Sequence, residues 1–136
     1  MRRLLNRVHH LLYAPGSHAS FDSGQLPTIV AELDHQLEEW HDVIPQPFQF
    51  TVSSLPCETQ QAAFLRQRYL TCRSVIYRPY LIWALEHVPS SAANTNLAST
   101  EWKNCKICLD SCILHISNLG NYAHTIMVDT WICSLS

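Results

Sequence analysis

The segment from Glu58 to His87, ETQQAAFLRQRYLTCRSVIYRPYLIWALEH, decides the fold class of this chain. Its apolar side chains recur every three or four residues, which is the spacing of one face of an α-helix. The stripe that we expect to be buried consists of Ala62, Leu65, Tyr69, Cys72, Ile76 and Trp83. Pro79 lacks an amide hydrogen and its ring crowds the preceding turn. The segment therefore predicts one long helix that is kinked or interrupted at Pro79.

Further helices are predicted on both sides of this segment. They are expected over residues 2–13, 26–41, 99–119 and 122–136, separated by loops that contain proline. Residues 88–98 are rich in Ser, Ala and Asn, a composition typical of a flexible linker. The sequence therefore predicts an all-α fold with about five helices.

The predicted helix over 26–41 is amphipathic. Its expected buried stripe is Leu26, Ile29, Leu33, Leu37 and Trp40. Its other face carries Glu32, Asp34, Glu38 and Glu39, which we expect to be solvated. If the Trp40 ring is buried, its replacement by alanine should destabilise the fold by about 3–5 kcal/mol.

The long helix also carries four arginines. At about 100° per residue they fan around the helix axis and form no single basic strip. We expect them to be solvated or to form local ion pairs. The four are Arg66, Arg68, Arg73 and Arg78.

Composition limits the classes of function. The 136 residues leave room for one domain, and 47% hydrophobic residues are enough to form a core. The net charge of -2 gives no general electrostatic reason to bind nucleic acid. No apolar run approaches the length of about 18 residues that a membrane-spanning helix needs, so we expect no membrane association.

The first residues bear on localisation. They lack the continuous apolar run of a secretory signal, which favours a reduced intracellular compartment. Residues 1–21 contain three arginines and no acidic residue, as mitochondrial transit peptides do. We favour the interpretation of these residues as an ordinary amphipathic helix over a transit peptide. A mitochondrial or a cytoplasmic location of the protein stays open as an alternative.

The segment CKICLDSC, residues 105–112, has cysteine spacings that are found in metal and redox sites. On a helical wheel Cys108 and Cys112 lie within about 60° of Cys105. Their stripe is shared with Leu109, Ile116 and Trp102. Free cysteine is among the most frequently buried residue types. We therefore interpret Cys105, Cys108 and Cys112 as core residues.

Metal and redox chemistry are less favoured alternatives. Structural zinc requires four ligands, and Cys108, Cys112 and His115 supply three at most. A redox C-x-x-C pair belongs at a helix N-terminus, whereas this pair falls inside a predicted helix. The chain has no G-x-S-x-G, no H-E-x-x-H and no phosphate-binding glycine loop. We therefore expect no enzyme activity, no bound metal and no cofactor.

Five segments resemble a known family in their order along the chain. They read LLNRVHHLLYAP, LDHQLEEWHDVIPQPFQF, FLRQRYLTCRSVIYRPYL, CLDSCILHISNL and DTWICSLS. The most specific parts are L-x-x-W-x-x-x-x-P and R-S-V-I-Y-R-P. Their residues are Leu37, Trp40, Pro45, Arg73, Tyr77, Arg78 and Pro79, for which we expect structural roles. Together these segments resemble the central regulatory region of fungal binuclear zinc-cluster transcription factors.

The resemblance implies a function. In that family the region is an all-helical domain that restrains or transmits transcriptional activation, often in response to small molecules or partners. DNA and zinc are bound by a separate cluster of six cysteines, which contains two C-x-x-C pairs. This chain has six cysteines but one such pair, so the cluster is absent. The resemblance thus implies a nuclear protein without DNA contact or zinc of its own.

The family's domain continues beyond the segment that matches DTWICSLS. The resemblance therefore implies that residues 1–136 are a fragment of an incomplete helical domain. Apolar faces left uncovered would be available to the missing part of the domain or to a protein partner. An alternative function is a small helical module that binds a hydrophobic ligand or a partner helix, if a cavity exists between the predicted helices over 58–87 and 99–119.

Overall fold

The structure confirms the all-α fold class. It is a computed structural model that describes residues 1–14, 24–86 and 100–119, and these parts contain no strand. The predicted helix over 122–136 and the predicted linker over 88–98 lie outside them. The elements in chain order are α1 (Arg2–Val8), the π-helical η1 (His9–Tyr13), α2 (Leu26–Asp42), the 3-10 turn η3 (Gln46–Phe48), α3 (Gln60–Glu86) and α4 (Thr100–Leu119).

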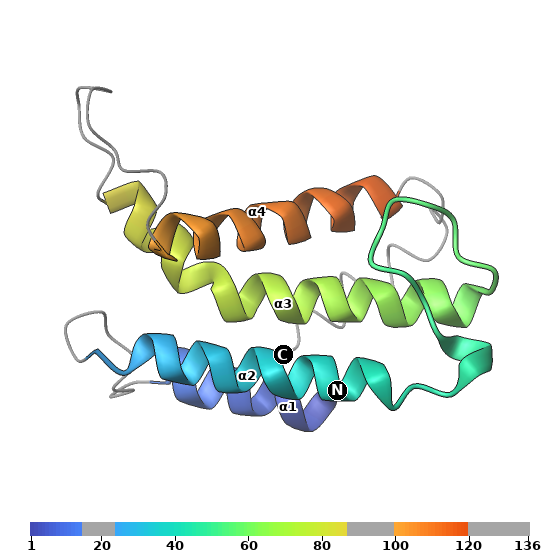
Figure 1. Cartoon of the computed structure of the whole chain (residues 1–136), viewed down its shortest axis with the longest axis horizontal. Helices are drawn as coiled ribbons and strands as arrows, with labels where there is room; N and C mark the ends of the chain where they lie inside the picture. The colour runs from blue at the N-terminus through green and yellow to red at the C-terminus, as the bar shows by residue number, and fades with distance from the viewer. Residues whose placement is uncertain (15–23, 87–99, 120–136) are drawn as a thin grey trace.

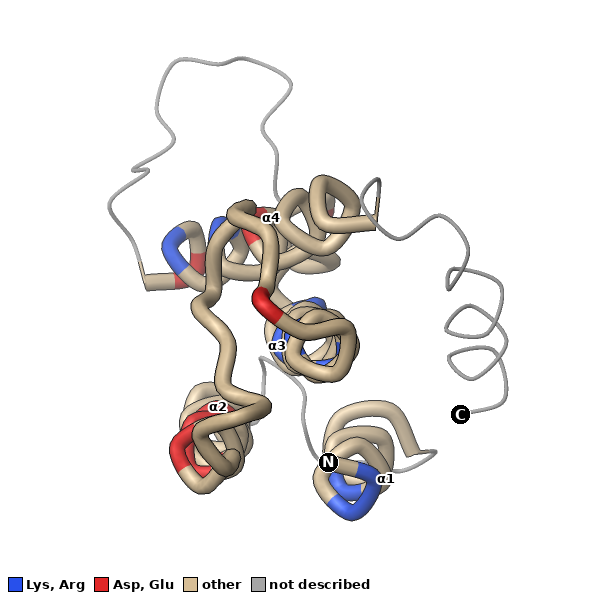
Figure 2. The backbone as a smooth tube through the Cα atoms, turned by 90° about the vertical axis from the view of Figure 1, so that its right-hand side faces the viewer, with Lys and Arg blue, Asp and Glu red and all other residues tan. Residues whose placement is uncertain are grey.

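Helix α3 lies at the centre of this arrangement. Helix α4 covers one side of it, and α2 and α1 lie next to each other on the opposite side (Figures 1 and 2). Figure 2 also shows acidic residues along α2 and basic residues on α1. The two helices form one ion pair, Arg7 with Glu32 at 3.8 Å, which is half-exposed and contributes little to stability.

The core runs between these helices. From α3 it contains Tyr69, Cys72 and Ile76, as the stripe predicts, whereas Leu65 and Trp83 are only partly buried. Helix α1 contributes Leu4 and Val8, so its apolar face packs inward as an ordinary amphipathic helix does. From α2 the buried residues are Leu26, Val30, Leu33 and Leu37.

The prediction for Trp40 needs correction. Its ring is only partly buried, and it lies with Ile29 at one edge of the buried face of α2. Val30 is buried on the other edge, because α2 packs against both α1 and α3 and its buried face is turned accordingly. A loss of about 3–5 kcal/mol applies to fully buried aromatic rings, so Trp40→Ala should cost less than that.

Helix α3 continues through Pro79 without interruption, and its last turns bend toward the side of α4 (Figure 1). The kinked alternative of the sequence prediction is therefore the one observed. Proline removes the amide hydrogen that would bond the carbonyl of Val75 four residues earlier. That carbonyl accepts a hydrogen bond from the Tyr13 hydroxyl at 2.6 Å instead. The bend thus creates an attachment point for η1.

The apolar stripe predicted for α4 is wrong in part. Its buried residues are Cys105, Cys108, Ser111 and Asn118, whereas Cys112 and Trp102 are partly buried. Leu109 and Ile116 are 43% and 67% exposed, and Ile113 beside them is 59% exposed. The buried arc is therefore displaced from Cys105 toward Asn118. The displacement arises because polar residues of α4 bond α3 directly.

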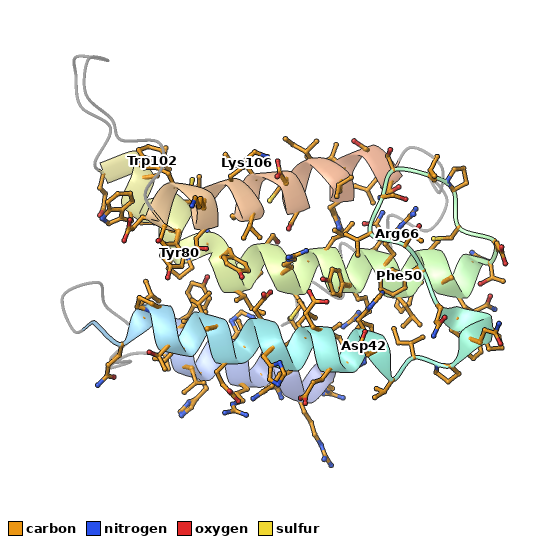
Figure 3. All side chains as sticks on the ribbon, in the orientation of Figure 1. Asp42, Phe50, Arg66, Tyr80, Trp102 and Lys106 are labelled. Atoms are coloured by element: carbon orange, nitrogen blue, oxygen red, sulfur yellow. The ribbon has the colours of Figure 1, made fainter. Side chains whose placement is uncertain are left out.

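Arg66 of α3 forms the hydrogen bond that keeps Asn118 of α4 buried. It is 1% exposed, in contrast to the solvated arginine that we predicted. Its guanidinium donates to the Leu55 carbonyl at 2.5 Å and to the Asn118 side-chain oxygen at 2.8 Å, and the Asn118 amide donates to the Ser53 carbonyl at 3.2 Å. Figure 3 shows Arg66 beside the loop that follows η3. The network fastens this loop to both α3 and α4.

Candidate functional site

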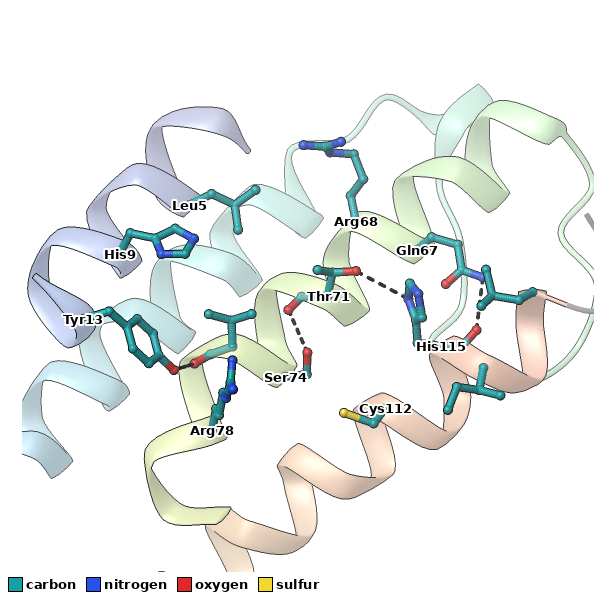
Figure 4. A pocket seen from close by; sticks show the side chains of 13 residues that line it. Leu5, His9, Tyr13, Gln67, Arg68, Thr71, Ser74, Arg78, Cys112 and His115 are labelled. Atoms are coloured by element: carbon teal, nitrogen blue, oxygen red, sulfur yellow. Dashed lines mark hydrogen bonds between the residues drawn. The ribbon is translucent and has the colours of Figure 1, made fainter. Parts of the chain in front are cut away.

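A cavity of about 530 Å³ lies between α1, α3 and α4, and Figure 4 shows it from close by. This volume falls in the range of about 300–1,000 Å³ that is typical of small-molecule pockets. Its walls come from three elements that are far apart in the sequence. Helix α1 and η1 supply Leu5, His9 and Tyr13, and α4 supplies Cys112, His115, Ile116 and Leu119.

One end of the pocket is closed by Tyr13. Its hydroxyl reaches the Val75 carbonyl, which the bend at Pro79 leaves without a helical donor. Burial raises the pKa of Tyr13 to about 12, although the positive charge of Arg78 partly opposes this shift. Tyr13 therefore remains protonated near neutral pH and continues to donate its hydrogen bond. This hydrogen bond holds η1 against α3 beside the pocket.

The opposite wall is polar, and only some of its polar atoms have hydrogen-bond partners. The Gln67 side-chain amide donates to the His115 carbonyl at 3.3 Å. Its oxygen is buried without a hydrogen-bond partner, and in Figure 4 it points into the pocket. Thr71 lies 3.4 Å from the His115 ring nitrogen, and Ser74 donates to the Thr71 carbonyl at 2.8 Å. The wall thus offers an unpaired buried acceptor.

The charges around the pocket have one sign. Arg68 and Arg78 line it, and none of the lining residues that the structure describes is acidic. The Arg68 guanidinium lies 5.6 Å from the Phe64 ring, which is a cation–π distance. Within the described parts of the chain, no carboxylate forms an ion pair with Arg78, whose side chain runs beside Tyr13 in Figure 4. The pocket is therefore electrostatically suited to an anion.

The thiols of CKICLDSC divide between the core and this pocket. Cys105 and Cys108 are buried, and Cys108 donates to the Ser74 carbonyl at 3.4 Å. Burial raises the pKa of Cys108 to about 12, so it is a poor nucleophile and metal ligand at neutral pH. Cys112 is partly buried and lines the pocket. Over residues 1–14, 24–86 and 100–119, no three His, Cys, Asp or Glu side chains are grouped as metal ligands.

The R-S-V-I-Y-R-P motif contacts α2, the helix that carries Leu37 and Trp40 of the other motif. Arg73 lies 3.8 Å from the Asp34 carboxylate, and its guanidinium is 5.8 Å from the Tyr69 ring. Tyr77 forms a side-chain hydrogen bond with the same carboxylate, and the Tyr69 hydroxyl donates to Glu38 at 2.5 Å. Asp34 and Glu38 therefore face α3, which corrects the prediction that the acidic face of α2 is solvated.

The remaining motif residues are distributed around this interface. Leu37 is fully buried in α2, and Pro45 is exposed just before η3. Pro79 lies in the bend of α3, whereas Arg78 is exposed on the pocket side. The structure thus brings Arg73 and Tyr77 into one cluster with α2 and places Arg78 elsewhere.

A cavity between the helices over 58–87 and 99–119 was the condition for the alternative ligand-binding function, and a cavity lies there with α1 as a third wall. Its lining groups were not predicted. Tyr13, Gln67 and His115 lie outside the two short motifs, and they converge only because α1, α3 and α4 pack together. One signal was available in the sequence. Pro79 inside a helix leaves the Val75 carbonyl without a donor, so a hydroxyl or amide from another element was to be expected there.

Comparison with known protein families, curated proteins and solved structures finds no match to this chain. Among the described helices, none has the length and apolar character needed to cross a bilayer. The functional argument therefore rests on the motifs and on the geometry of the α2–α3 interface and the pocket.

Proposed function

We propose that this chain is a non-enzymatic regulatory unit of the kind found in fungal binuclear zinc-cluster transcription factors. In this proposal residues 1–136 are part of a central regulatory domain that acts in the nucleus on DNA-templated transcription. The observation that carries it is the α2–α3 interface. Arg73 and Tyr77 of one motif bind Asp34, which lies one helical turn before Leu37 of the other motif. One motif therefore contacts the helix that carries Leu37 and Trp40 of the other motif.

In this proposal, DNA and zinc are bound by another part of the regulator. The chain itself acts through contacts with protein or ligand. Helix α4 carries a row of exposed apolar side chains, Leu109, Ile113 and Ile116, at helical spacing. Such a row suits the remainder of the domain or a protein partner.

A reporter assay tests the regulatory proposal. The chain would be placed between a heterologous DNA-binding domain and an activation domain, and reporter output would be compared with the same fusion lacking it. We expect the chain to lower the output severalfold. The double variant Arg73→Met/Tyr77→Phe should relieve this restraint, because it removes the polar contacts of α3 with Asp34.

The matched control is Lys103→Gln on the exposed side of α4, with fusion abundance measured by immunoblot. This variant should restrain the reporter as the natural chain does. Output that is identical with and without the chain, at equal abundance, would contradict the proposed regulatory role.

A second candidate function is a helical module that binds a small ligand. The pocket between α1, α3 and α4 favours it, because the pocket combines ligand-sized volume with an unpaired buried acceptor and unpaired positive charge. Binding there would couple α1 to α4 across α3. The two functions are compatible, since a regulatory domain can respond to a ligand.

A further inference from the structure

We propose that this pocket binds a small organic anion that has an apolar body and a hydrogen-bond donor. The inference rests on the second proposed function and specifies the chemistry of its ligand. Three properties of the pocket carry it: the sign of its charge, the unpaired oxygen of Gln67 and the apolar side chains between them.

The charge selects an anion. Arg78 and Arg68 contribute two permanent positive charges, and among residues 1–14, 24–86 and 100–119 no acidic side chain lines the pocket. A guanidinium offers several N–H donors in a planar fork that matches carboxylate and sulfonate groups. Of the two arginines, Arg78 is the one that we expect to bind the anionic group. It has no carboxylate partner among the described residues, whereas Arg68 already lies against Phe64.

The unpaired oxygen of Gln67 selects a donor. The Gln67 side chain is 6% exposed, and its amide nitrogen is already used by the His115 carbonyl. Its oxygen has no hydrogen-bond partner and lies beside the pocket with almost no accessible surface. Leaving a buried acceptor unpaired is destabilising, so rotation of the Gln67 side chain toward a ligand N–H or O–H gains a hydrogen bond and gives up none at this oxygen.

The apolar lining selects an apolar body. Leu5, Val75 and Leu119 line the pocket, together with the ring of Tyr13. Tyr13 uses its hydroxyl for the Val75 carbonyl, so it presents mainly its ring to a ligand. Small inorganic anions such as phosphate would leave these surfaces uncovered. The geometry therefore suits an aromatic or branched aliphatic body with the anionic group toward Arg78.

A pair of fluorescent probes tests the charge requirement. The anion 2-anilinonaphthalene-6-sulfonate has an aromatic body with an N–H donor at one end and a sulfonate at the other, and N-phenyl-2-naphthylamine has the same skeleton without the sulfonate. We expect Arg78→Gln to weaken sulfonate probe binding about tenfold, which corresponds to about 1.4 kcal/mol. The neutral probe should bind this variant as it binds the natural chain.

Two further variants complete the design. Gln67→Leu should weaken both probes, because both carry the N–H that meets the Gln67 oxygen. Arg2→Gln is the matched control, since Arg2 is exposed on α1 and does not line the pocket. It should leave both affinities unchanged. Circular dichroism of each variant establishes that the fold is retained.

Cysteine alkylation locates the bound probe without using its fluorescence. Cys112 lines the pocket and Cys57 lies outside it, and both are partly exposed. Saturating sulfonate probe should slow iodoacetamide alkylation of Cys112 severalfold, as followed by mass spectrometry of peptides, and should leave Cys57 unchanged. Binding that protects neither cysteine would place the probe elsewhere and overturn the inference.

The outcomes separate this inference from the regulatory proposal. If neither probe binds while the reporter responds to Arg73→Met/Tyr77→Phe, the pocket is not a ligand site and the regulatory proposal stands. If both probes bind and Arg78→Gln weakens neither selectively, the pocket takes apolar molecules and the anion requirement is wrong. Loss of sulfonate affinity alone, with protection of Cys112, is the result that we expect.

Discussion

Helix α3 has two opposite faces that are built from similar residue types and packed very differently. Tyr69, Arg73 and Tyr77 form the face toward α2, and Gln67, Thr71 and Arg78 belong to the face toward the pocket. At about 100° per residue, the centres of the two faces lie roughly 140° apart. One face is closed by its neighbours and the other borders a cavity.

The difference lies in the partners that each face meets. On the α2 side, Glu38 accepts from Tyr69, Asp34 meets Arg73 and Tyr77, and the Tyr69 ring packs against Phe50 at 5.8 Å between centroids. On the pocket side, the described residues of α1, η1 and α4 that line the cavity include no acidic one.

Both faces contain buried polar atoms without a hydrogen-bond partner: Asp34 Oδ1 and Arg73 Nε on the closed face, and Gln67 Oε1 on the open face. On the closed face these two atoms form an ion pair at 3.8 Å, whereas on the open face Arg78 has no ion-pair partner among the described residues. We infer that the first face serves stability and the second serves recognition. Substitutions on each face can separate the two roles.

The largest loss of stability is expected when a buried side chain of the closed face is removed. Tyr69 is 1% exposed, and Tyr69→Ala removes a buried ring together with the Glu38 hydrogen bond. We expect the free energy of unfolding to fall by about 3–5 kcal/mol. Thr71→Ala on the pocket face should cost less than about 1 kcal/mol, because Thr71 already borders a cavity. Urea denaturation measures both, and equal losses would contradict the comparison.

A smaller loss of stability is expected when the hydrogen bond between Tyr13 and Val75, beside the open face, is removed. Tyr13→Phe leaves the Val75 carbonyl beside Pro79 without a donor and should lower the free energy of unfolding by about 1–3 kcal/mol. In a Pro79→Ala background the new amide hydrogen can bond the same carbonyl. The cost of Tyr13→Phe should then be clearly smaller. A double-mutant cycle measures this coupling, and zero coupling would disprove the proposed relation.

Periodicity predicted much of this architecture from the sequence. The helices α2, α3 and α4 lie within a few residues of their predicted ranges, because their apolar side chains recur at helical spacing. The buried position of Leu37 and Cys72 followed from the same pattern. Which side of α4 would be buried did not follow.

The rest depended on contacts between distant segments. Asn118 faces inward because it bonds Arg66, 52 residues earlier, so the polar side of α4 is partly buried while Ile116 remains exposed. Asp34 and Glu38 looked like surface charges on a wheel of α2 alone, and only α3 supplies the tyrosines that bind them. The pocket is the extreme case, since three elements define it and no single segment shows its pattern.

A pH titration tests the charge cluster on the closed face. Burial raises the pKa of Asp34 above its ordinary value of 3.8, and the opposing contributions of Tyr77 and Arg73 do not cancel this. An acid with a raised pKa in the folded state stabilises the fold at low pH and loses this contribution as pH rises through that pKa. Asp34→Asn should therefore gain stability relative to the natural chain as pH rises from about 3 to about 7. Urea unfolding at several pH values across this range measures the difference. A variant that loses stability relative to the natural chain as pH rises would contradict the raised pKa of Asp34.

The smallest effect on stability is expected at the centre of the open face. Arg78 is exposed and has no ion-pair partner among the described residues, so Arg78→Gln should change the free energy of unfolding by less than about 0.5 kcal/mol. Arg73→Gln, five residues earlier on the closed face, should cost more, because it leaves Asp34 partly buried without its cation. Thermal and urea unfolding of this matched pair compare the same substitution on the two faces. A larger loss at Arg78 would mean that the pocket arginine is needed for the fold, and its availability to an anion would then no longer follow.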